Sequence, residues 1–129
     1  MRVKGSRLKE LKKLQDRMGY RYKDIALLNS ALTHSSYANE KGLKKDEYNE
    51  RLEFLGDAVL EMITSEFLYN EFADYAEGTL TKMRAALVRG QALGKHAREL
   101  GLGDFLQMGR GEEQNGGRSR ISILADTLE

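Results

Sequence analysis

Acidic side chains recur at helical spacing in the middle of the chain, and they are the residues best suited to chemistry. Residues 49–63 read NERLEFLGDAVLEMI. In an α-helix, four of their carboxylates would lie within about 80° of one another along one side: Glu50, Glu53, Asp57 and Glu61. The opposite side is apolar, so we expect a mostly buried helix whose acidic stripe faces something positive.

The acidic stripe needs a physical reason. Like charges one helical turn apart destabilise a helix by a few tenths of a kcal/mol per pair, and carboxylates in a partly dry site need a compensating cation. Mg²⁺ prefers oxygen ligands, typically one or two carboxylates with waters and substrate phosphates. The stripe therefore indicates a divalent-metal site, although an accidental exposed acidic face would have the same pattern. Gly56, inside the stripe, would let another backbone approach closely.

A second acidic pair lies near the end of the sequence. Asp126 and Glu129 are three residues apart, so a helix would place both on one face. An apolar stretch over residues 121–125 precedes them and would pack this segment into the core. Such a helix could complete a cluster with Glu53 and Asp57, but an acidic pair of this kind is common by chance.

The elements that must position these acids are predicted to be helical. The chain has no proline or cysteine and few strand-like runs, which favours one all-α domain over residues 1–129. Hydrophobic periodicity predicts helices over residues 7–18, 25–32, 48–72 and 79–100, a short helical piece within 33–40, and the entry to another helix at 121–129. Polar or glycine-rich composition predicts loops at residues 41–47 and 109–119.

Charge is unevenly distributed along the sequence, although the net charge is only +1. Residues 1–24 contain nine Lys or Arg and three acids, whereas residues 46–77 contain ten acids and one Arg. This distribution suits binding of a polyanion, whose charge would contact the basic segments of the protein and a metal ion held by the acidic central segment. The sequence has no long apolar run and no signal-peptide pattern, so nothing in it indicates membrane insertion or export. The absence of cysteine fits a reducing compartment such as the cytoplasm.

Two motifs together resemble the catalytic domain of the ribonuclease III family, in its bacterial form. They are ERLEFLGDAVL at residues 50–60 and LADTLE at residues 124–129. Lesser resemblances are LTHSSYAN at residues 32–39 and EGTLTKMRA at residues 77–85. The similarity extends over nearly the whole chain in the family's order.

The resemblance implies an endonuclease for double-stranded RNA that works as a homodimer with Mg²⁺, for which Mn²⁺ can substitute. It further implies processing of rRNA and mRNA precursors in the cytoplasm, with no membrane association. A two-fold dimer suits a duplex, because one site per subunit can face each strand. The apolar side of the central helix could form that interface, or it could pack within one subunit.

The resemblance also implies a role for each acid. Glu53, Asp126 and Glu129 match the family's metal ligands. Asp57 resembles its catalytic aspartate, working with Glu129. Two further acids match outer-shell or RNA-positioning residues: Glu50 and Glu77.

Contacts to RNA phosphates need basic side chains, because A-form RNA is recognised largely by shape, through phosphates and 2′-hydroxyls. The candidates are Lys82, Arg84, Arg89 and the lysines of residues 41–45. Each of them could equally be a solvated surface residue.

Two other functions compete with the nuclease. A catalytically inactive, ribonuclease-III-like module for binding double-stranded RNA or for assembly would gain nothing from keeping all four acids. A di-iron carboxylate protein would need Glu three residues before His, but Ala31 and Leu93 hold those positions before His34 and His96. We expect His34 to be a hydrogen-bonded structural residue and His96 to be peripheral.

The sequence departs from the family pattern at its end. In the family's catalytic domain an apolar helix continues beyond the second acidic motif, and bacterial members usually have a double-stranded-RNA-binding domain. This sequence stops at Glu129. We therefore expect the last helix to be incomplete and the 129-residue fragment to be inactive by itself.

Overall fold

Helices form most of the part of the chain that the computed structural model describes, residues 3–129. Among these residues there is no strand, only an isolated parallel bridge between Thr33 and Gln107, so the all-α prediction is confirmed. The helices are α1 (Gly5–Met18), α2 (Ile25–Ala31), α3 (Ser35–Lys41), η1 (Lys45–Glu47), α4 (Glu50–Glu71), α5 (Glu77–Val88), α6 (Gly90–Leu100), η2 (Leu102–Phe105), α7 (Arg110–Gln114), η3 (Gly117–Ser119) and α8 (Ile121–Leu128).

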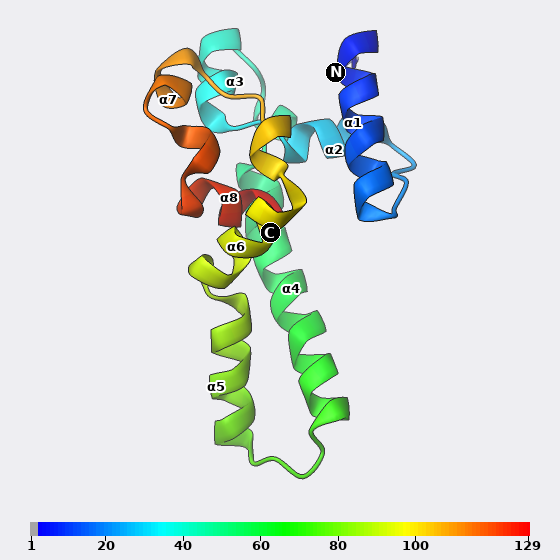
Figure 1. Cartoon of the computed structure of the whole chain (residues 1–129), viewed down its shortest axis with the longest axis vertical. Coiled ribbons are helices and arrows are strands. Elements are labelled where there is room, and N and C mark those ends of the chain that lie inside the picture. Colours follow the sequence, from blue (N-terminus) through cyan, green and yellow to red (C-terminus); the bar gives the residue numbers. More distant parts are fainter. Residues whose placement is uncertain (1–2) are drawn as a thin grey trace.

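The molecule consists of a body and a projecting hairpin (Figure 1). The antiparallel helices α4 and α5 form the hairpin, and the remaining helices surround the first turns of α4. Helix α8 packs against α6 and reaches α4 near the start of the hairpin. Two segments far apart in the sequence, the start of α4 and the end of α8, thus lie side by side.

The hydrophobic core lies in the body. Apolar side chains spaced by one helical turn on α1, α2, α6 and α8 meet there, together with those of η2 and the segment after it. The buried members are Leu11, Leu14, Leu28, Leu32, Ala97, Leu102, Phe105, Leu106, Met108, Ile123 and Leu124. Helix boundaries follow local signals: the Asp24 carboxylate accepts a hydrogen bond from the N–H of Ala26 (3.0 Å) at the start of α2. At the end of α1, Gly19 adopts a left-handed conformation with φ of 70°.

The prediction of a mostly buried central helix is wrong. Leu68 is the one buried residue of α4 in this chain, whereas Phe54 is 83% exposed and Met62 is 64% exposed. The apolar side of α4 does not pack on the body, because most of the helix extends away from it (Figure 1). Helical periodicity reveals an apolar face, but it does not reveal what covers that face.

The predicted helix over residues 79–100 is also wrong, because the chain forms two helices there. Arg89 has extended backbone angles (φ −68°, ψ 154°) and separates α5 from α6. As a result, Leu93 is buried in the body while Leu87 on the hairpin is 47% exposed.

Both predicted loops contain ordered helical turns. Residues 41–47 include η1, and residues 109–119 include α7 and η3. The second segment folds around Arg118, whose guanidinium donates to the carbonyls of Gly103 (2.9 Å) and Leu106 (2.6 Å). Hydrogen bonds from one polar side chain organise this segment, and they leave no hydrophobic period in the sequence.

Membrane insertion finds no support in the described residues. No helix between residues 3 and 129 combines the length and the apolar character that a bilayer crossing requires.

Candidate functional site

The first acidic pair enters the site from the start of α4. Asn49 precedes this helix, and its carbonyl accepts a hydrogen bond from the N–H of Glu53 (2.8 Å). Glu50 and Glu53 therefore lie in the first turn, where the exposed N–H groups of the helix favour negative charge.

The second acidic pair enters from α8, which is anchored in the core. Ile123, Leu124 and Ala125 are buried, so the partly exposed Asp126 and Glu129 emerge on the other side of the helix. The helix also lies very close to α6: a Cβ added at Gly94 would be 2.7 Å from a methyl carbon of Ile121. The apolar stretch before the acids thus fixes where they emerge.

Helices α4 and α8 touch at Gly56. A Cβ added there would lie 1.7 Å from the backbone oxygen of Glu129, so any residue other than glycine would force the two segments apart. The predicted close approach of another backbone at Gly56 is confirmed.

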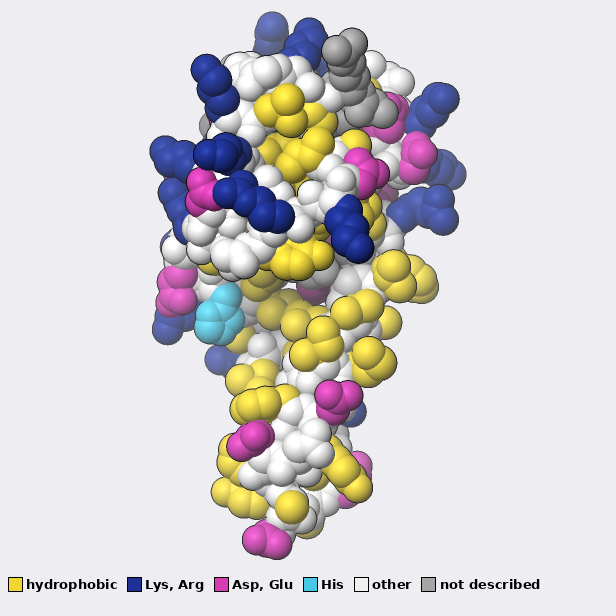
Figure 2. Space-filling view, turned by 90° about the vertical axis from the view of Figure 1, so that its right-hand side faces the viewer, with side chains coloured by type: hydrophobic (Ala, Val, Ile, Leu, Met, Phe, Trp, Pro, Cys, Tyr) yellow, Lys and Arg dark blue, Asp and Glu magenta, His cyan; other side chains and the backbone are white. Residues whose placement is uncertain are grey.

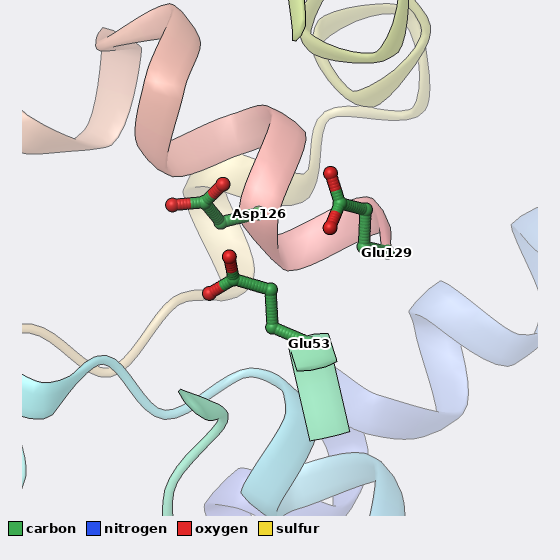
Figure 3. Close-up of side chains that lie close together, drawn as sticks. All are labelled: Glu53, Asp126 and Glu129. Carbon is green, nitrogen blue, oxygen red and sulfur yellow. The ribbon is translucent and has the colours of Figure 1, made fainter. Parts of the chain in front are cut away.

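Three carboxylates converge where the two helices meet (Figure 3). Glu53, Asp126 and Glu129 each offer one oxygen, and these oxygens all lie within 4.8 Å of one another. The structure therefore brings together the three residues that the sequence suggested as metal ligands. We call these three residues the acidic cluster.

Asp57 and Glu50 border the acidic cluster on α4. Both line a shallow surface hollow with two of the cluster residues, Glu53 and Glu129. Asp57 is exposed, one helical turn after Glu53. The predicted partnership of Asp57 with Glu129 is therefore geometrically possible, since both side chains face one hollow.

Burial and mutual repulsion raise the pKa values of the acidic cluster. The pKa of Glu53 rises from 4.5 to about 7, first because the side chain is partly buried and then because Asp126 and Glu129 are close. For Asp126, partial burial alone raises the pKa, against the lowering effects of a hydrogen bond with Glu53 and of nearby His34. The pKa of Glu129 is raised by burial and then by Asp57 and Asp126.

A divalent cation fits this site chemically. In the described part of the chain, no Lys or Arg forms an ion pair with a carboxylate of the acidic cluster. Clustered carboxylate oxygens are the ligands that hard cations such as Mg²⁺ and Mn²⁺ select. A bound cation would remove the repulsion that raises the pKa of Glu53.

We expect the metal-free chain to become less stable as pH rises. Between 4.5 and about 7 the folded state holds a proton on Glu53 that the unfolded state has lost, so the free energy of unfolding decreases through this range. Added Mg²⁺ should stabilise more strongly at higher pH, because metal binding requires the deprotonated carboxylates. Urea denaturation from about pH 5 to about pH 8, with EDTA or with Mg²⁺, measures both effects.

Glu53→Gln is the control for this pH dependence, since its amide does not titrate. It should flatten the dependence in EDTA and weaken the stabilisation by Mg²⁺. Identical pH dependence in the original chain and in Glu53→Gln would show that Glu53 is not the titrating group.

Glu77 is not brought to the acidic cluster. It begins α5 at the far end of the hairpin (Figure 1), and its carboxylate accepts a hydrogen bond from the hydroxyl of Thr81 (3.0 Å). An outer-shell role toward the cluster of the same chain is therefore wrong, whereas an RNA-positioning role stays a prediction.

The basic candidates for phosphate contacts differ in their surroundings. Lys82 and Arg89 are exposed. Arg84 is half-buried and ties α5 to α4, donating to the hydroxyl of Ser65 (3.0 Å) and lying 3.7 Å from the carboxylate of Glu61. Of these three, Lys82 and Arg89 remain available to a ligand.

The two histidines have the structural places that the sequence suggested. The Nδ1 atom of His34 accepts a hydrogen bond from the N–H of Ser36 (3.1 Å) and caps α3. His96 is exposed on α6, with Nδ1 3.6 Å from the carboxylate of Glu99.

Comparison with known proteins assigns the chain to a family. A family described as Ribonuclease-III-like matches residues 24–129. Ribonuclease 3 from Oleidesulfovibrio alaskensis is 56% identical over 117 residues, which cover 91% of this chain and 51% of that protein. Ribonuclease 3 from Clostridium tetani is 51% identical over 120 residues, which cover 93% and 50%. The chain thus spans about half the length of the curated relatives it matches.

A solved structure agrees with these relatives. The nuclease domain of ribonuclease III from Campylobacter jejuni, described as flexible in a region involved in dimer formation, matches with a TM-score of 0.82 and 49% identity. That match covers 92% of this chain and 78% of the Campylobacter chain. Sequence and fold therefore agree that the chain belongs to the ribonuclease III family and has the fold of the family's nuclease domain.

Proposed function

We propose that this chain is the nuclease domain of a Mg²⁺-dependent endoribonuclease that cleaves double-stranded RNA. The main support is the acidic cluster, in which carboxylates separated by more than seventy residues converge without an ion pair to Lys or Arg among the described residues. Membership of the ribonuclease III family supports the reaction class.

Glu53, Asp126 and Glu129 would hold the metal, since their oxygens converge. A divalent cation supplies Lewis-acid polarisation of a phosphoryl group and activation of water. The carboxylates must be deprotonated to bind it, and for Glu53, with a pKa of about 7, this costs little at neutral pH.

Asp57 and Glu129 would orient the attacking water and accept its proton. Both line the same open hollow, where a phosphodiester can approach from solvent. Glu50 borders that hollow one turn before Glu53. Its negative charge would repel phosphates from its own end of the hollow and so favour their binding beside the metal ligands. Proton transfer by a positioned carboxylate contributes on the order of 10² to 10⁴ in rate.

We propose that the chain acts as a homodimer through the apolar face of α4. Figure 2 shows hydrophobic side chains gathered along the hairpin, below the surface of the body on which Lys and Arg predominate. The exposed apolar residues of this face are Leu55, Val59, Met62, Ile63 and Phe67. An exposed apolar face of this length is typical of a protein interface, and the Campylobacter nuclease domain is described as forming a dimer.

The proposed dimer makes a testable prediction. Met62→Lys places a charge in the middle of the apolar face, so we expect the dimer dissociation constant to rise by about 30-fold or more, as for an interface hot spot. Analytical ultracentrifugation over a concentration series measures it. Gln114→Lys is the matched control, because it adds the same charge at an exposed polar position on α7, outside the hairpin. Equal dissociation of both variants would place the interface elsewhere.

Duplex RNA would be bound by its phosphates, with Lys82, Arg89 and the lysines of residues 41–45 as contacts. In this proposal the substrates are rRNA and mRNA precursors in the cytoplasm. The direct experiment incubates duplex and single-stranded RNA, in Mg²⁺ or EDTA, with the chain and with an extended version in which the apolar helix of the family's catalytic domain is added after Glu129. We expect the extended version to cleave the duplex alone, and only with Mg²⁺; binding without cleavage by the extended version would favour the inactive binding module.

A further inference from the structure

The acidic cluster requires α4 to be fixed relative to the body, although most of that helix projects away from it (Figure 1). Glu53 comes from the first turn of α4, whereas Asp126 comes from α8 and Glu129 directly follows that helix. A small rotation or slide of α4 would separate their oxygens. One contact that opposes such a movement is the approach of Gly56 to Glu129, and a second precedes Glu53 in the sequence.

This second contact is made by Asn49. The residue is only 6% exposed. Its N–H donates to the carbonyl of Thr33 (3.0 Å), and its side-chain Nδ2 donates to the carbonyl of Ala31 (3.3 Å). Its own carbonyl accepts the N–H of Glu53 (2.8 Å). Asn49 is thus bonded to the body on one side and to a proposed metal ligand on the other.

The side chain of Asn49 does not do what asparagine usually does at the start of a helix. An N-cap asparagine normally accepts a hydrogen bond from an N–H of the first turn, but Asn49 makes no such bond. Its amide instead donates to a different segment of the chain. The side chain therefore fastens the helix to the body rather than satisfying the helix end.

The segment that receives Asn49 is itself rigid. Thr33 is fully buried, and its hydroxyl lies within hydrogen-bond distance of two acceptors, the carbonyl of Asn29 (2.6 Å) and the Oε1 atom of Gln107 (2.9 Å). Two backbone hydrogen bonds also join Gln107 to Leu32 (2.8 Å) and His34 (2.9 Å).

We infer that Asn49 is a positioning residue for Glu53: it fixes the rotation and height of α4 so that the Glu53 carboxylate meets those of α8. This inference rests on the proposed metal centre. Residues that orient metal ligands in this way typically contribute 10- to 100-fold to metal affinity. Thr33 and Gln107 support Asn49 in turn.

Asn49→Asp tests the inference, with Mn²⁺ as the probe. The change removes the donor to Ala31 and keeps the size of the side chain and a good helix cap. Added negative charge by itself would tighten cation binding, whereas loss of positioning would weaken it. We expect the Mn²⁺ dissociation constant of the otherwise metal-free chain, measured by calorimetry, to rise by about 10- to 100-fold. Unchanged or tighter binding would overturn the inference.

Two further variants separate positioning from general stability. Asn49→Ala removes the same donor without adding charge and should weaken Mn²⁺ binding similarly. Gln15→Ala removes another buried amide, which accepts the N–H of Tyr22 (2.7 Å) and is not hydrogen-bonded to α4 or α8. It should lower the unfolding midpoint and leave the Mn²⁺ constant unchanged; equal weakening in Gln15→Ala would overturn the inference. No Mn²⁺ binding by the original chain would overturn the proposed metal centre as well.

Discussion

Asp126→Asn, introduced into the extended version of the chain, is expected to abolish RNA cleavage while duplex RNA still binds. The change keeps the size of the side chain and removes one of the three converging carboxylates. We expect the cleavage rate to fall on the order of 10³-fold, equivalent to about 4 kcal/mol of transition-state stabilisation. Duplex affinity, measured by fluorescence anisotropy, should change by less than about three-fold, because phosphate contacts dominate such binding.

The same variant should also lose metal affinity in the absence of RNA. Asp126 adds to the negative charge that raises the pKa of Glu53, so its neutralisation should bring that pKa down toward 4.5.

Raising the Mg²⁺ concentration should recover part of the cleavage if Asp126 acts as a ligand. Glu99→Gln is the matched control, since it neutralises an exposed acid on α6 outside the acidic cluster. Unchanged turnover in Asp126→Asn would contradict the assignment.

Spacing alone predicted each acidic pair, because the two members of a pair lie close together in the sequence, whereas the resemblance to the ribonuclease III family implied that the two pairs meet. Spacings of three and four residues decide which side of a helix an acid occupies, and Glu53, Asp57, Asp126 and Glu129 satisfy that condition within short segments. Gly56 was predictable for a similar reason, because a glycine within a helix often marks a close approach.

What the sequence could not predict depends on contacts between distant segments. The apolar face of α4 has the period of a buried helix, yet Met62 and Ile63 are exposed in the single chain. The break at Arg89 lacks a proline. Asn49 gave no sequence signal of its own, since an isolated asparagine before a helix usually indicates an ordinary cap rather than a hydrogen bond to residue 31.

Gly56→Ala should disrupt the site through the backbone. Helix propensity alone predicts that this substitution stabilises α4 by about 1 kcal/mol. The added Cβ, however, would lie 1.7 Å from the backbone oxygen of Glu129 and 2.4 Å from its carbonyl carbon, and no side-chain rotation relieves a contact with backbone. We therefore expect a net destabilisation of about 1 to 3 kcal/mol, as for overpacking in a core, measured by urea denaturation.

Metal binding should respond more strongly than stability to Gly56→Ala, because separating α4 from α8 moves Glu53 away from Asp126 and Glu129. We expect at least about a 100-fold loss of Mn²⁺ affinity, the upper end of the range for outer-shell changes, and a matching loss of cleavage. Gly78→Ala is the control: Gly78 is also helical, but a Cβ there meets no atom within 4 Å. Only the higher helix propensity of alanine should therefore affect the stability of this variant. Wild-type stability and Mn²⁺ affinity in Gly56→Ala would mean that the two helices do not approach closely in solution, and the acidic cluster could not then form as described.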